Sequence, residues 1–160
     1  MSSPSPFRNF FHAGYVVLDL AKVIDNMAAR FGVERWKILP LPAGAPAKAI
    51  GFAYAQQTMI ELVELDLAQE VLPIHRGWLP RSESEARLNH LAYMLDSEEE
   101  LGAVRARFEA RQIATAWLDT FGDIFSCYYY ADTTAELGHF SEFVCLGPAG
   151  RDFLAEIPRN

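Results

Sequence analysis

The chain has 160 residues, of which 51% are hydrophobic and 12% aromatic, and this composition supports a packed interior and excludes a disordered chain. Its formal net charge of −7 argues against a nucleic-acid partner, which requires a basic surface. No apolar run reaches the roughly 18 residues of a membrane span, and the Ser/Pro-rich N-terminus has no signal-peptide pattern. We therefore expect a cytoplasmic protein with no membrane partner.

The first half of the chain predicts a β-α-β-β-β order within a module over residues 7–66. A strand over 11–18 is followed by a helix that Asp19 caps and Gly32 ends, with apolar residues at the 3.6-residue spacing. Strands are then predicted over 33–39, 49–55 and 59–65, from their aromatic and β-branched content.

Residues 67–85 form the predicted linker, which is rich in proline and polar residues. We expect a short helix at 67–71, Trp78 packed against the body of the protein, and His75 exposed to solvent. A linker of this length covers a site, contacts a second copy or merely connects two modules, and the sequence does not distinguish these roles.

The second half repeats the order in a module over residues 86–147. A strand over 87–95 precedes a helix that begins with the capping box Ser97-x-x-Glu100. Strands follow over 113–118, 124–131 and 140–146, a loop separates the last two, and the tail 148–160 is expected to form a final helical turn. Cys127 and Cys145 fall in predicted strands and are expected to be buried thiols, with a disulfide between neighbouring strands as the alternative, which nothing in the sequence indicates.

Both halves carry a histidine at the start of the first strand and a glutamate in the last strand. These residues are His12 and Glu61 in the first half, and His90 and Glu142 in the second. Because side chains alternate along a strand, all four face away from the helices. An ionised carboxylate on an apolar face is costly unless it is paired or bound to metal. The repeat therefore predicts a divalent-metal site, whose imidazole and carboxylate ligands suit zinc, nickel, cobalt, manganese or iron.

This repeat, with its two histidine–glutamate pairs, resembles the vicinal oxygen chelate superfamily from about residue 11 to residue 146. That superfamily includes glyoxalase I, methylmalonyl-CoA epimerase, extradiol dioxygenases and bleomycin-resistance proteins, and the long linker is most similar to epimerase-type members. The resemblance implies an α+β fold in which two tandem βαβββ modules form curved mixed sheets around a central cup. It also implies a homodimer and one divalent metal ion, with the family's ligand positions falling on His12, Glu61, His90 and Glu142.

Three departures from the family pattern narrow the reaction. Residues 13–17 are apolar where glyoxalase I carries an arginine for the glutathione carboxylate, which argues against a glutathione substrate. Residues 47–53 hold no acid where epimerase-type members carry an additional base, which argues against a two-base epimerisation. The loop 132–139 lacks the His-Pro and Gly-Gly pattern of the epimerase-type members.

We expect a metal-dependent lyase or isomerase in which Glu61 or Glu142 acts as the base and the ion stabilises an enolate. Two alternatives stay open. One is an iron(II) extradiol-type dioxygenase that uses both histidines and Glu142, with Glu61 as a bystander. The other is a metal-free protein that binds a small molecule. The substrate is expected to have two adjacent oxygens and an apolar portion, and the residues expected to contact it are Tyr130, His139, Phe140, Met94 and Met59.

Overall fold

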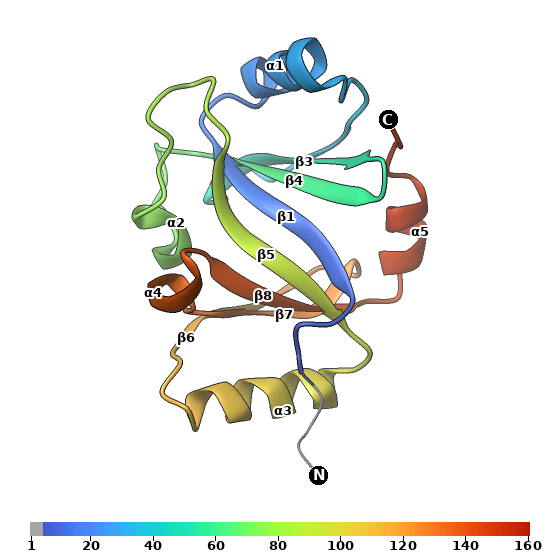
Figure 1. Cartoon of the computed structure of the whole chain (residues 1–160). Helices are drawn as coiled ribbons and strands as arrows, with labels where there is room; N and C mark the ends of the chain where they lie inside the picture. The colour runs from blue at the N-terminus through green and yellow to red at the C-terminus, as the bar shows by residue number, and fades with distance from the viewer. Residues whose placement is uncertain (1–4) are drawn as a thin grey trace. The chain divides into compact units, whose positions relative to one another are not determined.

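The computed structural model describes residues 5–160 (Figure 1). The first four residues of the Ser/Pro-rich N-terminus lie outside this part. The chain divides into two compact units. Unit N comprises His12–Asn89 and Glu156–Asn160, and unit C comprises His90–Ala155 with the N-terminal residues up to Phe11.

Unit N contains the first β-α-β-β-β repeat in a mixed sheet with the strand order β2-β3-β4-β1. β1 runs parallel to β4, and the other neighbours are antiparallel. A parallel pair needs a long crossover, which the helix and two strands between β1 and β4 provide. Its elements are β1 (Phe10–Val17), α1 (Leu20–Phe31), β2 (Lys37–Pro40), β3 (Ala47–Ala55), β4 (Thr58–Leu65) and α2 (Pro73–Arg76).

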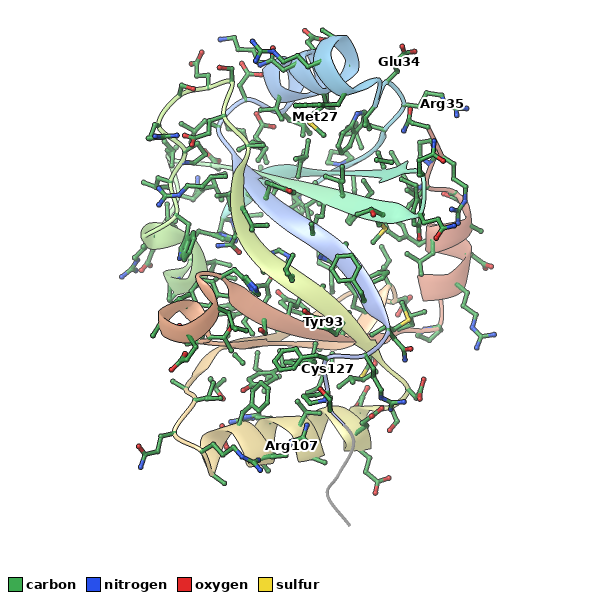
Figure 2. All side chains as sticks on the ribbon, viewed as in Figure 1. Met27, Glu34, Arg35, Tyr93, Arg107 and Cys127 are labelled. Atoms are coloured by element: carbon green, nitrogen blue, oxygen red, sulfur yellow. The ribbon has the colours of Figure 1, made fainter. Side chains whose placement is uncertain are left out.

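Helix α1 covers one face of this sheet. As predicted, Asp19 caps the helix by accepting a hydrogen bond from the Lys22 backbone N–H at 3.0 Å. Gly32 ends it in the left-handed region with φ of 69°, where a residue without a Cβ is favoured. Met27 extends from α1 towards the strands (Figure 2). The buried residues of this layer are Val17, Leu20, Val23, Ala49 and Leu62.

Unit C repeats the same architecture with the strand order β5-β8-β7-β6, in which β5 and β8 are the parallel pair. Its elements are β5 (Arg87–Leu95), α3 (Glu98–Glu109), β6 (Thr115–Phe121), β7 (Phe125–Ala131), α4 (Thr134–Leu137), β8 (Phe140–Leu146) and α5 (Gly150–Ala155). The predicted βαβββ order and α+β class are confirmed in both units.

Helix α3 covers one face of the unit C sheet. Ser97 Oγ accepts a hydrogen bond from the Glu100 backbone N–H at 3.1 Å, and Glu100 Oε2 accepts one from the Asp96 N–H at 3.1 Å. The capping box therefore closes one residue earlier than the sequence pattern suggests. Phe7 packs edge-on against Tyr93, with ring centroids 5.2 Å apart, which ties the N-terminal segment to this unit. The buried layer consists of Leu95, Leu101, Val104, Phe108, Tyr129, Ala131, Phe143 and Cys145.

Two predicted strands begin two or more residues later than expected. β2 begins at Lys37 and not at residue 33, because Asn160 Oδ1 accepts hydrogen bonds from the backbone N–H groups of Glu34 and Arg35 at 3.0 and 2.8 Å. These two donors are therefore not available to a ladder. β6 begins at Thr115 and not at residue 113, since the Ile113 N–H still donates to a carbonyl at the end of α3.

The helix expected at 67–71 is wrong. The Asp66 carboxylate accepts a hydrogen bond from the Ala68 N–H at 3.1 Å, and this short-range bond holds a turn there. The helix of the linker is α2, which has Pro73 at its first position, where the missing N–H of proline costs nothing. The loop between β7 and β8 contains the short helix α4. No described helix is long and apolar enough to cross a membrane.

Gly147, directly after β8, is required by a close approach between two backbone segments. A Cβ built at this position would lie 2.3 Å from the Asp123 carbonyl oxygen. The Gly147 N–H also donates to the Ile124 carbonyl oxygen at 2.8 Å. The turn between β6 and β7 is therefore packed against the chain after β8 with no room for a side chain.

We predict that Gly147→Ala lowers the free energy of unfolding by about 1–3 kcal/mol, the usual range for overpacking against atoms that cannot move aside. The matched control is Gly102→Ala, in the middle of α3, where a Cβ meets nothing within 4 Å. That change is expected to raise stability by about 0.5–1 kcal/mol, through helix propensity. Urea denaturation followed by circular dichroism measures both. Equal effects of the two substitutions would contradict the packing argument.

Candidate metal centre

In unit N, the register of the parallel pair brings a histidine and a glutamate together. His12 lies opposite Met59, and Gly14 lies opposite Glu61. Since Gly14 has no side chain, the Glu61 carboxylate can lean across it towards His12. The His12 Nε2 and Glu61 Oε2 atoms are 3.4 Å apart, and the two residues are only 1% and 7% exposed.

Unit C builds the same arrangement from different residues. His90 lies opposite Phe140, and Ala92 lies opposite Glu142. The small Ala92 side chain again leaves space on the diagonal, and the His90 Nε2 and Glu142 Oε2 atoms are 3.4 Å apart. Both residues are buried. Each unit thus carries a half-site, defined here as its histidine, its glutamate and the small residue opposite that glutamate.

The nitrogen–oxygen separation in each half-site is informative. At 3.4 Å it exceeds the roughly 2.9 Å of a good hydrogen bond. Two ligands that each lie about 2.1 Å from one tetrahedral ion are also about 3.4 Å apart, so each pair has a spacing that two ligands of one ion can have. A buried carboxylate also requires a compensating positive charge. The donor types and their spacing therefore fit a divalent cation.

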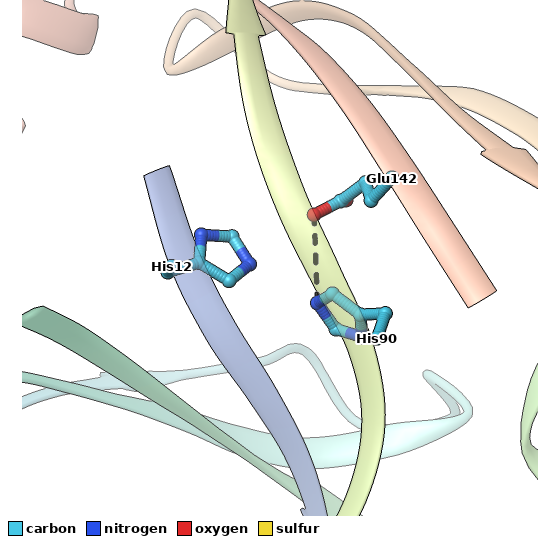
Figure 3. A group of neighbouring side chains, drawn as sticks. All are labelled: His12, His90 and Glu142. Atoms are coloured by element: carbon cyan, nitrogen blue, oxygen red, sulfur yellow. Dashed lines mark ion pairs between the residues drawn. The ribbon is translucent and has the colours of Figure 1, made fainter. Parts of the chain in front are cut away.

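Three residues form a group that could hold such an ion. One ligand atom each from His12, His90 and Glu142 lies within 4.8 Å of the other two, and all three residues are buried. Figure 3 shows these side chains on β1, β5 and β8, with the His90–Glu142 ion pair dashed. Glu61, expected as a fourth ligand, is not in this group, and its role as a ligand stays a prediction.

The two half-sites differ in the residue that lies opposite the glutamate on the antiparallel neighbouring strand. In unit N, Phe52 of β3 lies opposite Glu61. In unit C, Tyr130 of β7 lies opposite Glu142. The Tyr130 hydroxyl is 3.4 Å from each ring nitrogen of His90, and the two rings pack edge-to-face with centroids 5.0 Å apart. The equivalent place in unit N has an aromatic ring without a hydroxyl.

The other residues expected to contact substrate differ in their position relative to the two histidines. Met59 and Phe140 are buried directly opposite the two histidines. Met94 is half-buried further along β5. His139 is half-buried, with its Nδ1 atom 2.8 Å from the Phe140 carbonyl oxygen, so it braces the turn into β8. The roles of these residues towards a substrate stay predictions.

The expected exposure of His75 is wrong. His75 lies in α2 and is only 6% exposed. The helix is anchored because the Asn89 side-chain amide donates a hydrogen bond to the Ile74 carbonyl oxygen at 2.8 Å. Asn89 directly precedes His90 in the sequence. A four-residue helix shows no periodicity, so no local pattern of the sequence indicates this burial. Trp78 packs as predicted, against buried residues that include Val63.

Comparison with known proteins gives matches to solved structures only. No protein-family model and no curated protein matches the sequence. A hypothetical protein from Bacillus halodurans C-125 superposes with a TM-score of 0.62 at 14% identity, over 86% of this chain and 93% of that one. Methylmalonyl-CoA epimerase from Mycobacterium tuberculosis matches with a TM-score of 0.61 at 14% identity, over 97% of both chains.

A methylmalonyl-CoA epimerase variant from Streptomyces coelicolor is similar as well. It matches with a TM-score of 0.59 at 12% identity, over 88% of this chain and 95% of that one. At these identities the likeness establishes the fold and not the reaction. The chain has the vicinal oxygen chelate fold of the glyoxalases and methylmalonyl-CoA epimerases.

Proposed function

We propose that the chain is a divalent-metal-dependent lyase or isomerase of the glyoxalase and epimerase type, acting on a small molecule with two adjacent oxygens. The observation that carries this proposal is the position of Glu61. It is a buried carboxylate, 3.4 Å from His12, outside the group of three residues that could hold the ion. A carboxylate placed there can act as a proton acceptor beside the substrate.

His12, His90 and Glu142 would hold the ion through neutral imidazole nitrogens and a carboxylate oxygen, a donor set that suits zinc, nickel, cobalt, manganese or iron. When bound, the ion supplies Lewis-acid stabilisation of negative charge on a substrate oxygen. The remaining chemistry comes from side chains of this protein.

Glu61 takes a proton from the carbon next to the substrate carbonyl and returns it in the second half of the reaction. The aromatic ring of Phe52 and the thioether of Met59, both fully buried, flank this carboxylate and its histidine in the sheet. An apolar surrounding excludes water from the carbanion. The Tyr130 hydroxyl, beside His90, is the phenol that would donate a hydrogen bond to a substrate oxygen.

The same residues support a proposal for the substrate class. Phe140 and Met59, next to the histidines in the register, would contact an apolar portion adjoining the two oxygens. Acyl-CoA thioesters, the class that the names of the similar epimerases specify, are therefore included among the compounds to test, together with 2-oxo acids and hemithioacetals. The homodimer expected from the resemblance stays a prediction.

We predict that the purified chain binds about one equivalent of a divalent ion. His90→Ala or Glu142→Ala is expected to weaken binding by more than about 100-fold, since loss of even an outer-shell contact costs up to that factor. Ion at 100 times its Kd should add about 2.7 kcal/mol to the stability of the folded state. Elemental analysis and thermal unfolding measure these quantities.

The matched control for this experiment is His139→Ala, which removes a histidine whose ring nitrogen contacts a backbone carbonyl and which is outside the group of three. Its metal content should equal that of the wild type. A wild-type chain that takes up no ion, and whose Tm does not respond to any of the five metals, would instead indicate a metal-free binding protein.

We predict that Glu61→Gln keeps the metal stoichiometry and lowers proton exchange by about 100-fold or more, the usual contribution of a general base. Proton NMR in D₂O, which follows loss of the signal next to the carbonyl for each test compound, measures this exchange. Glu64→Gln is the control, because Glu64 lies on the same strand but accepts a hydrogen bond from the Leu20 N–H. Loss of the ion in Glu61→Gln would make Glu61 a ligand and contradict its assignment as the base.

A second candidate function is favoured by the composition of the group of three. Two histidines and one carboxylate are the ligand set of many iron(II) oxygenases. A dioxygenase of this type would consume oxygen when it is loaded anaerobically with iron(II) and then given a catechol and air. For the lyase or isomerase that we propose, an oxygen electrode should record no uptake above the iron-free control. Uptake that disappears in His90→Ala would select the dioxygenase.

A further inference from the structure

Two cysteines of unit C lie directly opposite each other in the sheet. Cys127 of β7 pairs with Cys145 of β8 in an antiparallel register, and both are free thiols. They face α3, on the side of the sheet away from Glu142, and Cys145 belongs to the buried layer while Cys127 packs against it. Figure 2 labels Cys127 and Tyr93 between the strands and α3.

The register gives the geometry of a disulfide. Residues opposite each other in an antiparallel ladder have Cα atoms about 4.5–5.5 Å apart and side chains on the same face. A disulfide joins Cα atoms about 4.4–6.8 Å apart. The register is also irregular between Phe125 and Cys127, and a bulge loosens the local ladder. The two sulfur atoms can therefore meet without rearrangement of the fold.

We propose that Cys127 and Cys145 are a thiol modification site, which a low-molecular-weight disulfide converts reversibly into a cross-strand disulfide. The Cys127 thiolate attacks one sulfur of the reagent, whose sulfur–sulfur bond breaks and whose first thiol leaves with a proton. The deprotonated Cys145 sulfur then attacks the Cys127 sulfur and displaces the second thiol. The chain loses two electrons and two protons, and the reagent is reduced to two thiols.

The order of attack follows from exposure. Cys127 is half-buried, whereas Cys145 is only 3% exposed, so the reagent reaches Cys127 first. Burial raises the pKa of the Cys127 thiol and raises that of Cys145 to about 11. Both thiols are therefore protonated at neutral pH, and the reaction accelerates as the thiolate fraction rises with pH. The charged groups that act on these two thiols are Glu98, Glu100 and Arg105 of α3, Asp119 of β6, and Asp96.

The position of the pair relates it to the candidate metal centre. Cys145 lies three residues after Glu142 on β8, and Cys127 lies three residues before Tyr130 on β7. Tyr130 and Glu142 are themselves a register pair. A covalent bond at the cysteines would fix the alignment of the two strands that carry these residues. Formation of this bond depends on the register of β7 and β8 and does not require the proposed reaction.

The test treats the full chain with oxidised glutathione, quenches with acid and alkylating reagent, and maps peptides without reduction. The wild type is expected to lose two hydrogen atoms and to yield one peptide linked through Cys127 and Cys145. Cys145→Ala should instead accumulate glutathione on Cys127, because no second thiol displaces it. Cys127→Ala should react at least about tenfold more slowly than the wild type, since its only thiol is buried. The wild-type rate should rise about tenfold from pH 7 to pH 8.

Three results would overturn the proposal. They are a wild-type chain that stays reduced, one that keeps a stable glutathione adduct as Cys145→Ala does, and a link that forms only between two chains or only in denaturant. Near-ultraviolet circular dichroism shows whether each variant is folded. Metal content is measured in parallel, so a failure of the disulfide and a failure of the metal site are recorded separately.

Discussion

The parallel pairing of the first and last strands in each β-α-β-β-β repeat is the constraint on which the candidate metal centre depends. In a parallel register, residues opposite each other point to the same face. The repeat places a histidine on the first strand and, two positions later, a small residue opposite the glutamate: Gly14 opposite Glu61 and Ala92 opposite Glu142. A shift by one residue would turn the glutamate towards the helix layer. The hydrophobic layers under α1 and α3 fix the register and therefore also fix the half-sites.

This geometry places carboxylate side chains in the buried interior, where proteins ordinarily avoid charged groups. Each glutamate is under a tenth exposed, and an isolated buried carboxylate is strongly disfavoured. A neighbouring imidazole at 3.4 Å only partly compensates for the lost hydration. A divalent cation compensates for the carboxylate charge and binds neutral imidazole and ionised carboxylate in the same step. The apolar packing that holds the strands in register thus also favours metal binding, because it keeps competing water away from the ligands.

Periodic patterns allowed much of the fold to be predicted from the sequence. The α1 caps at Asp19 and Gly32 were predictable because a cap depends on neighbouring residues. The strand β8 was predictable as a short, mostly apolar run bounded by turn residues. The late start of β2 was not predictable, since the Asn160 side chain that holds Glu34 is 126 residues away in sequence. The burial of His75 was also missed, because it depends on an anchor from Asn89 and not on any local pattern.

The same distinction applies to the candidate site. The sheet face on which the two histidines and two glutamates lie could be inferred from the sequence, because successive side chains along a strand point to opposite faces. Whether Glu61 joins His12, His90 and Glu142 as a ligand depends on separations of about an ångström, which a strand pattern does not encode. In the structure these three residues form a group without Glu61. Packing around the repeat therefore decides which side chains come within reach of a single ion.

The two half-sites are built alike but are not chemically equivalent. At corresponding positions on the outer strand, unit N carries Phe52 opposite its glutamate and unit C carries Tyr130. Both are large, buried aromatic residues, so the packing requirement is met equally well by either ring. The hydroxyl beside His90 is thus an addition that packing alone does not require. The half-site of unit C therefore has a hydrogen-bond donor beside its histidine, whereas the residue opposite the glutamate of unit N offers only an apolar ring. Under the proposed function, this difference would assign the hydrogen-bond donor to one half-site and the proton acceptor to the other, because in an enolisation the oxygen that gains charge and the carbon that loses a proton are different atoms.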